Sequence, residues 1–182
     1  MLPEAVRRLG VLSARQRRQL EGVGASRRAL RRDGFAYHPG RRVWCQGPVP
    51  RLLAHQLAVG ELLVAAVALG QDPAALTVAP LLPYRSPAGG RRSLDPDALL
   101  RLGGLPVAIE VDMGTESAGV LRHKWYRYRE YRQEVVALPL LVVAPPGRHR
   151  LVRATLAASG LDRVGVGQDL ARALESLRAE PA

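Results

Sequence analysis

The spacing of apolar and polar positions in the first 50 residues predicts three short helices. A first helix is expected over 2–9, and a second, capped by Ser13, runs to about Leu20. The turn Gly22-Val23-Gly24 leads into a third helix that ends at Asp33-Gly34, where glycine favours helix termination. The short turn between the second and third helices predicts a helix-turn-helix.

Two alternating segments follow the third helix and predict a β-hairpin. Residues 35–38 and 41–46 flank Pro39-Gly40, a dipeptide typical of tight turns. A basic hairpin after a helix-turn-helix would be the wing of a winged helix-turn-helix. We therefore expect residues 1–48 to form a winged helix-turn-helix domain.

The third helix combines an apolar inner side with a basic outer side. Ala29 and Leu30 are expected to face inward, so that the arginines around them project outward. A helix of this kind is suited to lie against DNA. The candidate DNA contacts are Ser26, Arg27, Arg28, Arg31 and Arg32 in the helix and Arg41 and Arg42 just past the hairpin tip. The alternative interpretation is a small basic helical cap whose arginines only keep the protein in solution.

Residues 50–69 are apolar nearly all round a helix, which predicts a buried element. Glu61 interrupts this pattern. An unpaired buried carboxylate is very costly, so Glu61 either lies at the exposed end of the buried face or points into a polar site. The sequence leaves both interpretations open.

A second β-hairpin is predicted around Gly103-Gly104. If these glycines form a two-residue turn, Leu102 lies opposite Leu105, and the residue numbers of each cross-strand pair add up to 207. One face of the hairpin is then apolar throughout, which supports the register. On the other face, Asp97 lies opposite Glu110 and Asp95 lies opposite Asp112.

Carboxylates that face one another repel, so this face of the hairpin needs compensation. A divalent cation, nearby arginines or raised pKa values would each supply it. Oxygen ligands of this kind suit Mg²⁺ or Mn²⁺, and the candidate metal ligands are Asp97, Glu110 and Asp112. The alternative interpretation is a solvated acidic edge that is relieved by salt and by Arg101.

The rest of the chain alternates helices and strands. We expect a helix from Ser117 to about Ala137, strands over 138–144 and 162–166, and helices over 148–159 and 168–178. Together with the hairpin, these elements predict an α/β domain with a central mixed sheet, and hence an α+β protein.

The first of these helices carries further candidate chemistry. Arg122 and Arg127 are candidate phosphate contacts because basic and aromatic residues alternate there. Lys124 is the only lysine among 27 basic residues, so a compact ammonium group is a candidate requirement at this position.

The positive charge of the chain is concentrated at one end. The formal net charge is +11, and the first 50 residues hold 11 arginines against three acids, a net of +8. Such a charge density favours a nucleic-acid partner. The composition changes near residue 48, so residues 49–182 are expected to form the second domain. No apolar run reaches the roughly 18 to 20 residues of a membrane span, and with one cysteine and no visible secretory signal the protein is expected to be cytoplasmic, away from membranes.

Two acidic motifs carry a family resemblance. Pro96-Asp97 and Glu110-Val111-Asp112, after a helix with Glu61, resemble the PD-(D/E)xK nuclease fold. In that family an Asp and a Glu bind Mg²⁺, and a lysine two places later assists the attacking water. Asp112 stands in the lysine position here, and Lys124 is a candidate for a migrated lysine. The resemblance implies a restriction-endonuclease-like domain with the candidate catalytic residues Asp97, Glu110, Asp112, Lys124 and Glu61.

A narrower resemblance covers most of the chain. The segments PDALLRL, IEVDMGTES and LRHKWYRYREY, after a basic winged helix, resemble the replication-relaxation family of plasmids and integrative elements. The resemblance implies a role in the replication or mobilisation of such an element. It also implies double-stranded DNA as a partner, beside a replication, relaxase or recombination protein.

Three functions are therefore under consideration. The first is a DNA-binding accessory protein that does not cleave. The second is an endonuclease or nickase that depends on Mg²⁺ or Mn²⁺, and the third is a winged-helix transcriptional regulator whose second domain serves dimerisation or effector binding. The sequence leaves the oligomeric state open.

Overall fold

The computed structural model describes residues 1–179. The chain divides into two compact units, the first over Met1–Ala79 and the second from Pro80 onward. This division differs from the expected boundary after residue 48, because helix α4 (Leu53–Ala68) packs on α1, α2 and β1 and so belongs to the first unit. The last three residues of the expected second domain lie outside the described part of the chain.

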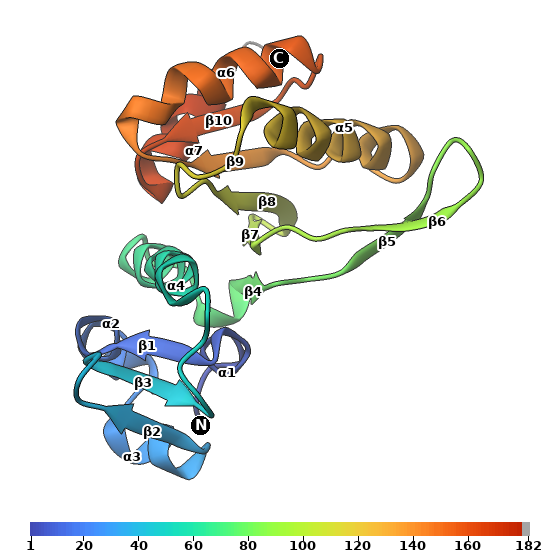
Figure 1. The fold of residues 1–182 in the computed structure, drawn as a ribbon. Coiled ribbons are helices and arrows are strands. Elements are labelled where there is room, and N and C mark those ends of the chain that lie inside the picture. The colour runs from blue at the N-terminus through green and yellow to red at the C-terminus, as the bar shows by residue number, and fades with distance from the viewer. Residues whose placement is uncertain (180–182) are drawn as a thin grey trace. The chain divides into compact units, whose positions relative to one another are not determined.

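The first unit begins with helices and a small sheet (Figure 1). Its elements before α4 are α1 (Glu4–Leu9), β1 (Val11–Ser13), α2 (Ala14–Gln19), a 3-10 turn (Glu21–Val23), α3 (Arg27–Arg32), β2 (Phe35–His38) and β3 (Val43–Gln46). The three strands form an antiparallel sheet in the order β1-β3-β2. The three helices and the hairpin confirm the predicted elements, whereas β1 was not expected.

Serine side chains cap the starts of α2 and α3, and of these two caps only that of Ser13 was predicted. The Ser13 hydroxyl accepts a hydrogen bond from the Gln16 backbone N–H at 3.1 Å, and the Gln16 side chain accepts one from the Ser13 N–H at 2.8 Å. The Ser26 hydroxyl accepts the Ala29 N–H at 3.2 Å. These caps satisfy N–H groups that would otherwise lack partners and fix where each helix begins.

Helix α4 confirms the apolar helix that was predicted over 50–69. Leu62 and Leu63 are among its buried residues, and Gln16 reaches it by donating to the Leu57 carbonyl at 2.6 Å. A Cβ at Gly60 would lie 2.9 Å from the Gln16 amide nitrogen, so glycine permits this close approach. A 3-10 turn (Pro73–Ala75) and β4 (Leu76–Val78) complete the unit.

The second unit contains strands and three longer helices. Its elements are β5 (Leu82–Arg85), β6 (Arg91–Leu94), β7 (Ala98–Leu102), β8 (Leu105–Val111), α5 (Ala118–Glu134), β9 (Leu140–Val143), a 3-10 turn (Pro146–Arg148), α6 (His149–Ala158), β10 (Val164–Gly167) and α7 (Leu170–Arg178). Its main sheet contains β10, β9, β8 and β7, adjacent in that order. It is mixed, because β7 and β8 are antiparallel while β8, β9 and β10 are parallel. The protein is therefore α+β with a mixed sheet, as predicted.

The β7–β8 hairpin has the register that the sequence predicts. Leu102 pairs with Leu105 across Gly103-Gly104, and Ala98 pairs with Ile109. Both glycines have positive φ angles, which the turn requires. Glu110 therefore falls on the opposite face of the sheet from Ile109.

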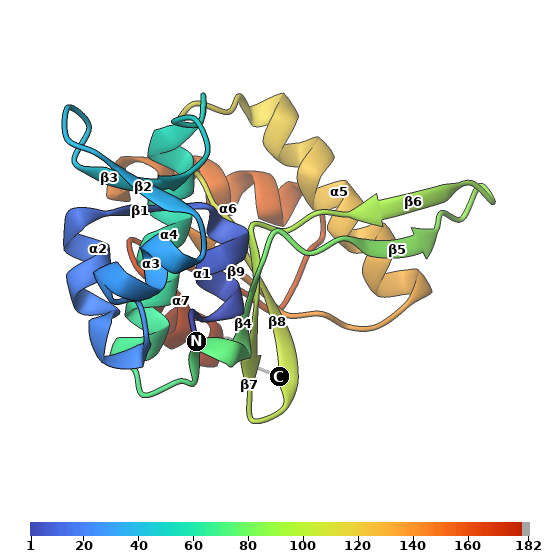
Figure 2. The same cartoon turned by 90° about the horizontal axis from the view of Figure 1, so that it is seen from below.

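Helices cover the two faces of this sheet differently. Helices α5 and α6 lie on one face (Figures 1 and 2), where Trp125 and Tyr128 pack on a buried cluster with Val164 and Val166 of β10. Side chains alternate along a strand, so the residues between and beyond these valines face α7. These residues are Gly165 and Gly167, and a Cβ on either would overlap the α7 backbone around Ala173.

Strands β5 and β6 form a separate two-stranded sheet that lies beside α5 (Figure 2). Arg92 of β6 lies 2.8 Å from the buried Glu130 carboxylate, and the Tyr84 hydroxyl donates to the same oxygen at 3.1 Å. The sequence did not predict this hairpin. Within residues 1–179, no helix combines the length and the apolar character that a membrane span needs.

Candidate functional site

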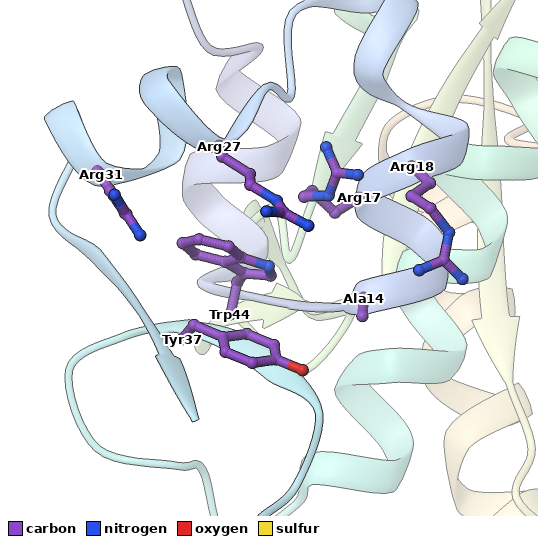
Figure 3. A pocket seen from close by; sticks show the side chains of 7 residues that line it. All are labelled: Ala14, Arg17, Arg18, Arg27, Arg31, Tyr37 and Trp44. Carbon is purple, nitrogen blue, oxygen red and sulfur yellow. The ribbon is translucent and has the colours of Figure 1, made fainter. Parts of the chain in front are cut away.

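A basic pocket of about 240 Å³ opens in the first unit (Figure 3). Its lining consists of Ala14, Arg17, Arg18, Arg27, Arg31, Tyr37 and Trp44. The arginines extend from α2 and α3, and the two aromatic rings come from the β2–β3 hairpin (Figure 3). We call it the arginine pocket.

Local structure explains how these side chains meet. Arg27 and Arg31 are four residues apart, which places them on one side of α3. Tyr37 and Trp44 face each other across the hairpin, with ring centroids 5.3 Å apart and planes tilted by 44°. Trp44 is buried, whereas 43% of Tyr37 is exposed. The exposed part of Tyr37 is therefore free to contact a ligand.

The arginine pocket has little negative charge of its own. Arg17 is buried, and its Nη1 lies 3.0 Å from the Glu21 carboxylate without a hydrogen bond of good geometry. Within residues 1–179, no acid lines the pocket or forms an ion pair with Arg18, Arg27 or Arg31. The guanidinium groups are thus available for an external anion.

The predicted DNA contacts lie in and around this pocket. Arg27 and Arg31 line it, while Arg28 and Arg32 are exposed elsewhere on α3. Ser26 uses its hydroxyl to cap the helix. The hairpin turn carries two further exposed residues of the predicted set, Arg41 and Arg42.

Four lining residues were missed from the sequence. Arg17 and Arg18 lie on α2, which was not singled out, and their signal is the basic run in RQRR. Tyr37 and Trp44 were assigned to the hairpin without a role. Their signal is the register itself, because a turn at residues 39–42 makes them cross-strand neighbours.

A second, smaller cavity of about 130 Å³ lies in the second unit. It is lined by Leu94, Asp95, Asp97, Glu110, Lys124, Arg127 and Tyr128. We call it the carboxylate cavity. It brings together three of the predicted catalytic residues, namely Asp97, Glu110 and Lys124.

Glu110 is bonded through both of its oxygens. The Tyr128 hydroxyl donates to Oε1 at 2.7 Å, and the Lys124 ammonium donates to Oε2 at 3.1 Å. The same ammonium lies 3.2 Å from the Glu116 carboxylate. Lys124 therefore links a β8 carboxylate to one in the loop before α5, and Glu116 and Tyr128 were not predicted for this role.

Burial has the largest effect on the pKa of Glu110. It raises the pKa of Glu110 to about 7, with Lys124 opposing the rise and Asp97 adding to it. Burial also lowers the pKa of Lys124, but the Glu110 and Glu116 charges outweigh it, so that this pKa is raised. Lys124 therefore stays charged at neutral pH and compensates the acids around it.

Asp112 is compensated by a different cation. Arg148 Nε lies 3.0 Å from Asp112 Oδ2, and Arg148 also donates to the Glu116 carbonyl at 2.6 Å. Asp112 Oδ1 accepts the Gly114 N–H at 2.8 Å. The residue in the expected lysine position is thus a buried acid held by an arginine, which the sequence did not indicate.

The donor set does not fit a divalent cation as it stands. Both oxygens of Glu110 and both oxygens of Asp112 already accept bonds from donors of the chain, and Asp97 Oδ2 accepts the Val111 N–H at 2.8 Å. Mg²⁺ requires near-octahedral oxygen coordination. Residues 1–179 contain no group of three or more His, Cys, Asp or Glu placed to hold a metal ion, and no metal-dependent step follows from this geometry.

The remaining predicted site residues lie outside these two groups of contacts or serve a structural role. Glu61 accepts from Gln16 at 3.0 Å and pairs with Arg15 at 3.4 Å, both in the first unit. Arg127 donates to the Ser93 carbonyl and to Asp95. Arg122 is exposed on α5.

These observations describe a two-unit α+β protein with a basic first unit and a mixed sheet in the second. A family model described as Replication-relaxation matches residues 6–140. The chain therefore belongs to the replication-relaxation family, and this membership points to a role in replication or mobilisation. No curated protein and no solved structure matches the chain.

Proposed function

We propose that the protein is a DNA-binding accessory factor that serves the replication or mobilisation of a plasmid or integrative element without cleaving DNA. The observation that carries the proposal is the arginine pocket, with four guanidinium groups and no acid in its lining. Guanidinium groups bind phosphates strongly because they donate several hydrogen bonds in one plane.

The order of elements in the first unit supports a winged helix. The chain runs α1, β1, α2, α3, β2, β3, with β1 joining the hairpin in one sheet. In this interpretation α3 is the recognition helix, with Arg28 and Arg32 toward double-stranded DNA. The β2–β3 turn is the wing, and Arg41 and Arg42 contact the backbone. Arg122 adds a contact from the second unit, whereas Arg127 orders the β6 end.

The carboxylate cavity supports the non-cleaving part of the proposal. Lys124 pairs with Glu110 in this cavity, and Arg148 pairs with Asp112 outside its lining. Two of the three acids predicted to bind a metal are thus paired with cations of the chain. The favoured partner is a replication, relaxase or recombination protein that supplies the strand chemistry. Self-association is a further proposal, and a symmetric dimer on a palindromic site would favour a regulator instead.

A salt titration tests the DNA-binding proposal. About six phosphate contacts would give a slope near −5 in a plot of log affinity against log salt concentration. The expected result is a steep slope on a duplex, measured by fluorescence anisotropy. Weak binding with a flat salt dependence would contradict the proposal.

A cleavage assay separates the proposal from the metal-dependent alternative, which the shared location of Asp97, Glu110 and Lys124 favours. Supercoiled plasmid is incubated with the protein and Mg²⁺, Mn²⁺ or a chelator. We expect a mobility shift and intact DNA in all three. Nicking that requires metal and is lost in Asp97→Ala would instead establish a nuclease.

A further inference from the structure

We propose that the arginine pocket holds an unpaired nucleotide, with its phosphate against the arginines and its base against Tyr37. The proposal rests on DNA binding by the first unit and names the form of DNA that this site recognises. A winged helix that grips a duplex by α3 alone does not need such a pocket.

The shape of the site suits one nucleotide unit. The cavity is concave and measures about 240 Å³, below the roughly 300 Å³ at which pockets for drug-sized ligands begin. A duplex presents its phosphates on a convex ridge and keeps its bases stacked inside. A single unpaired nucleotide can enter a concave site with both its phosphate and its base.

The lining of the arginine pocket offers one group of residues for a phosphate and another for a base. Four guanidinium groups come from two helices, and the exposed face of an aromatic ring comes from the hairpin. Stacking of bases on aromatic side chains is the usual means of binding unpaired strands, and it requires no particular base. Tyr37 rests against the buried Trp44, which holds its ring in place.

Arg17 adds a buried cation to the lining of the arginine pocket. Only 6% of this residue is exposed, and its Nη1 has no hydrogen-bond acceptor of good geometry although Glu21 lies 3.0 Å away. Buried polar atoms normally have hydrogen-bond partners. The Arg17 charge therefore favours a phosphate in the arginine pocket, while its buried Nη1 lies against Glu21.

The test compares three DNA probes of the same sequence, namely a blunt duplex, that duplex with a few unpaired thymines at its centre, and the single strand. Affinity is measured by anisotropy for the full chain and for Tyr37→Leu, Tyr37→Phe and Tyr126→Leu. Tyr126 is the matched control, because it is 42% exposed on α5 and has Arg129 over its ring at 5.2 Å. Thermal melts check that each variant is folded.

We expect Tyr37→Leu to lose about tenfold in affinity for the two probes with unpaired bases and less than about twofold for the blunt duplex. Tyr37→Phe should retain the preference, and Tyr126→Leu should match the wild type. An equal loss on all probes, or no loss on any, would overturn the inference. If the wild-type protein binds no duplex at all, the proposed function fails, and selective binding of the unpaired probes would still sustain the pocket's role.

Discussion

The arginine pocket and the carboxylate cavity are both small and lined by charged residues, but they differ in whether those charges are paired within the protein. In the arginine pocket, guanidinium groups from α2 and α3 face a lining without acids. In the carboxylate cavity, Lys124 pairs with Glu110 and Arg127 pairs with Asp95. Uncompensated charge at a surface is available to a ligand, whereas charge that is paired inside the protein is already compensated by the chain itself.

Burial explains why the arginine pocket and the carboxylate cavity differ. Arg27 and Arg31 are exposed, so water solvates them at little cost until an anion arrives. Glu110 lies beneath α5 and is nearly inaccessible. A charge in that position is costly unless a partner is built in, and the only lysine of the chain stands there.

Removing the built-in cation should have the largest effect. We expect Lys124→Met to lower the free energy of unfolding by about 2 to 3 kcal/mol, because it leaves Glu110 and Glu116 uncompensated. Chemical denaturation at a pH above the pKa of Glu110 measures the loss. Millimolar Mg²⁺ should restore part of it in the variant and leave the wild type unchanged.

The exposed Arg122→Met on the same helix is the matched control and should change stability little. Stabilisation of the wild type by Mg²⁺ that disappears in Lys124→Met would contradict the comparison. Lys124 would then support a metal site instead of replacing one.

Removing the uncompensated cations should have an intermediate effect on binding and none on stability. We expect the double variant Arg27→Ala, Arg31→Ala to bind DNA about 30-fold more weakly, with a salt slope less steep by about two. Its melting temperature should stay the same or rise slightly, because two like charges four residues apart repel. Anisotropy and thermal melts measure both quantities.

Arg150→Ala on α6 serves as the control, since this arginine is exposed in the second unit. A comparable loss of affinity in Arg150→Ala would mean that binding depends on net charge alone. The arginine pocket would then have no special role.

The pH dependence of stability should show the smallest effect. The pKa of Glu110 is about 7 in the folded protein against an ordinary 4.5, so the folded state retains a proton that the unfolded chain releases. The contribution of protonated Glu110 to the free energy of unfolding is therefore fully present below about pH 4.5 and is lost as the pH rises through about 7. Glu110→Gln should flatten this decline by at least about 1.4 kcal/mol, the equivalent of one pKa unit, in denaturation curves across that range. A parallel decline in both proteins would show that other groups cause it.

Local signals in the sequence predicted much of the fold correctly. Ser13 caps α2 as predicted, and the helix that was expected from Ser117 begins there with the Ser117 hydroxyl as its cap. The Gly103-Gly104 turn allowed the hairpin register to be predicted, because this pairing gives the hairpin one face that is apolar throughout. Capping and turn chemistry act over three or four residues, which is why the chain order alone reveals them.

Features that depend on distant partners were not predicted. Strand β1 has three residues and forms only because β3 returns beside it. The β5–β6 hairpin contains Pro83 and adjacent arginines, which are not typical of strands, and Glu130 of α5 is what holds Arg92 there. The arginine pocket likewise needs two helices and a hairpin at once, so its residues are visible in the sequence but their convergence is not.

The glycines of β10 limit how this protein can vary in evolution. Every amino-acid substitution at Gly165 or Gly167 adds a Cβ, and in both cases that atom would overlap the backbone of α7. The close packing of β10 on α7 therefore requires glycine at these two positions, although neither glycine has a side chain that could take part in chemistry. Natural variants of this chain should accumulate elsewhere, for example at the exposed Leu105 in the β7–β8 hairpin.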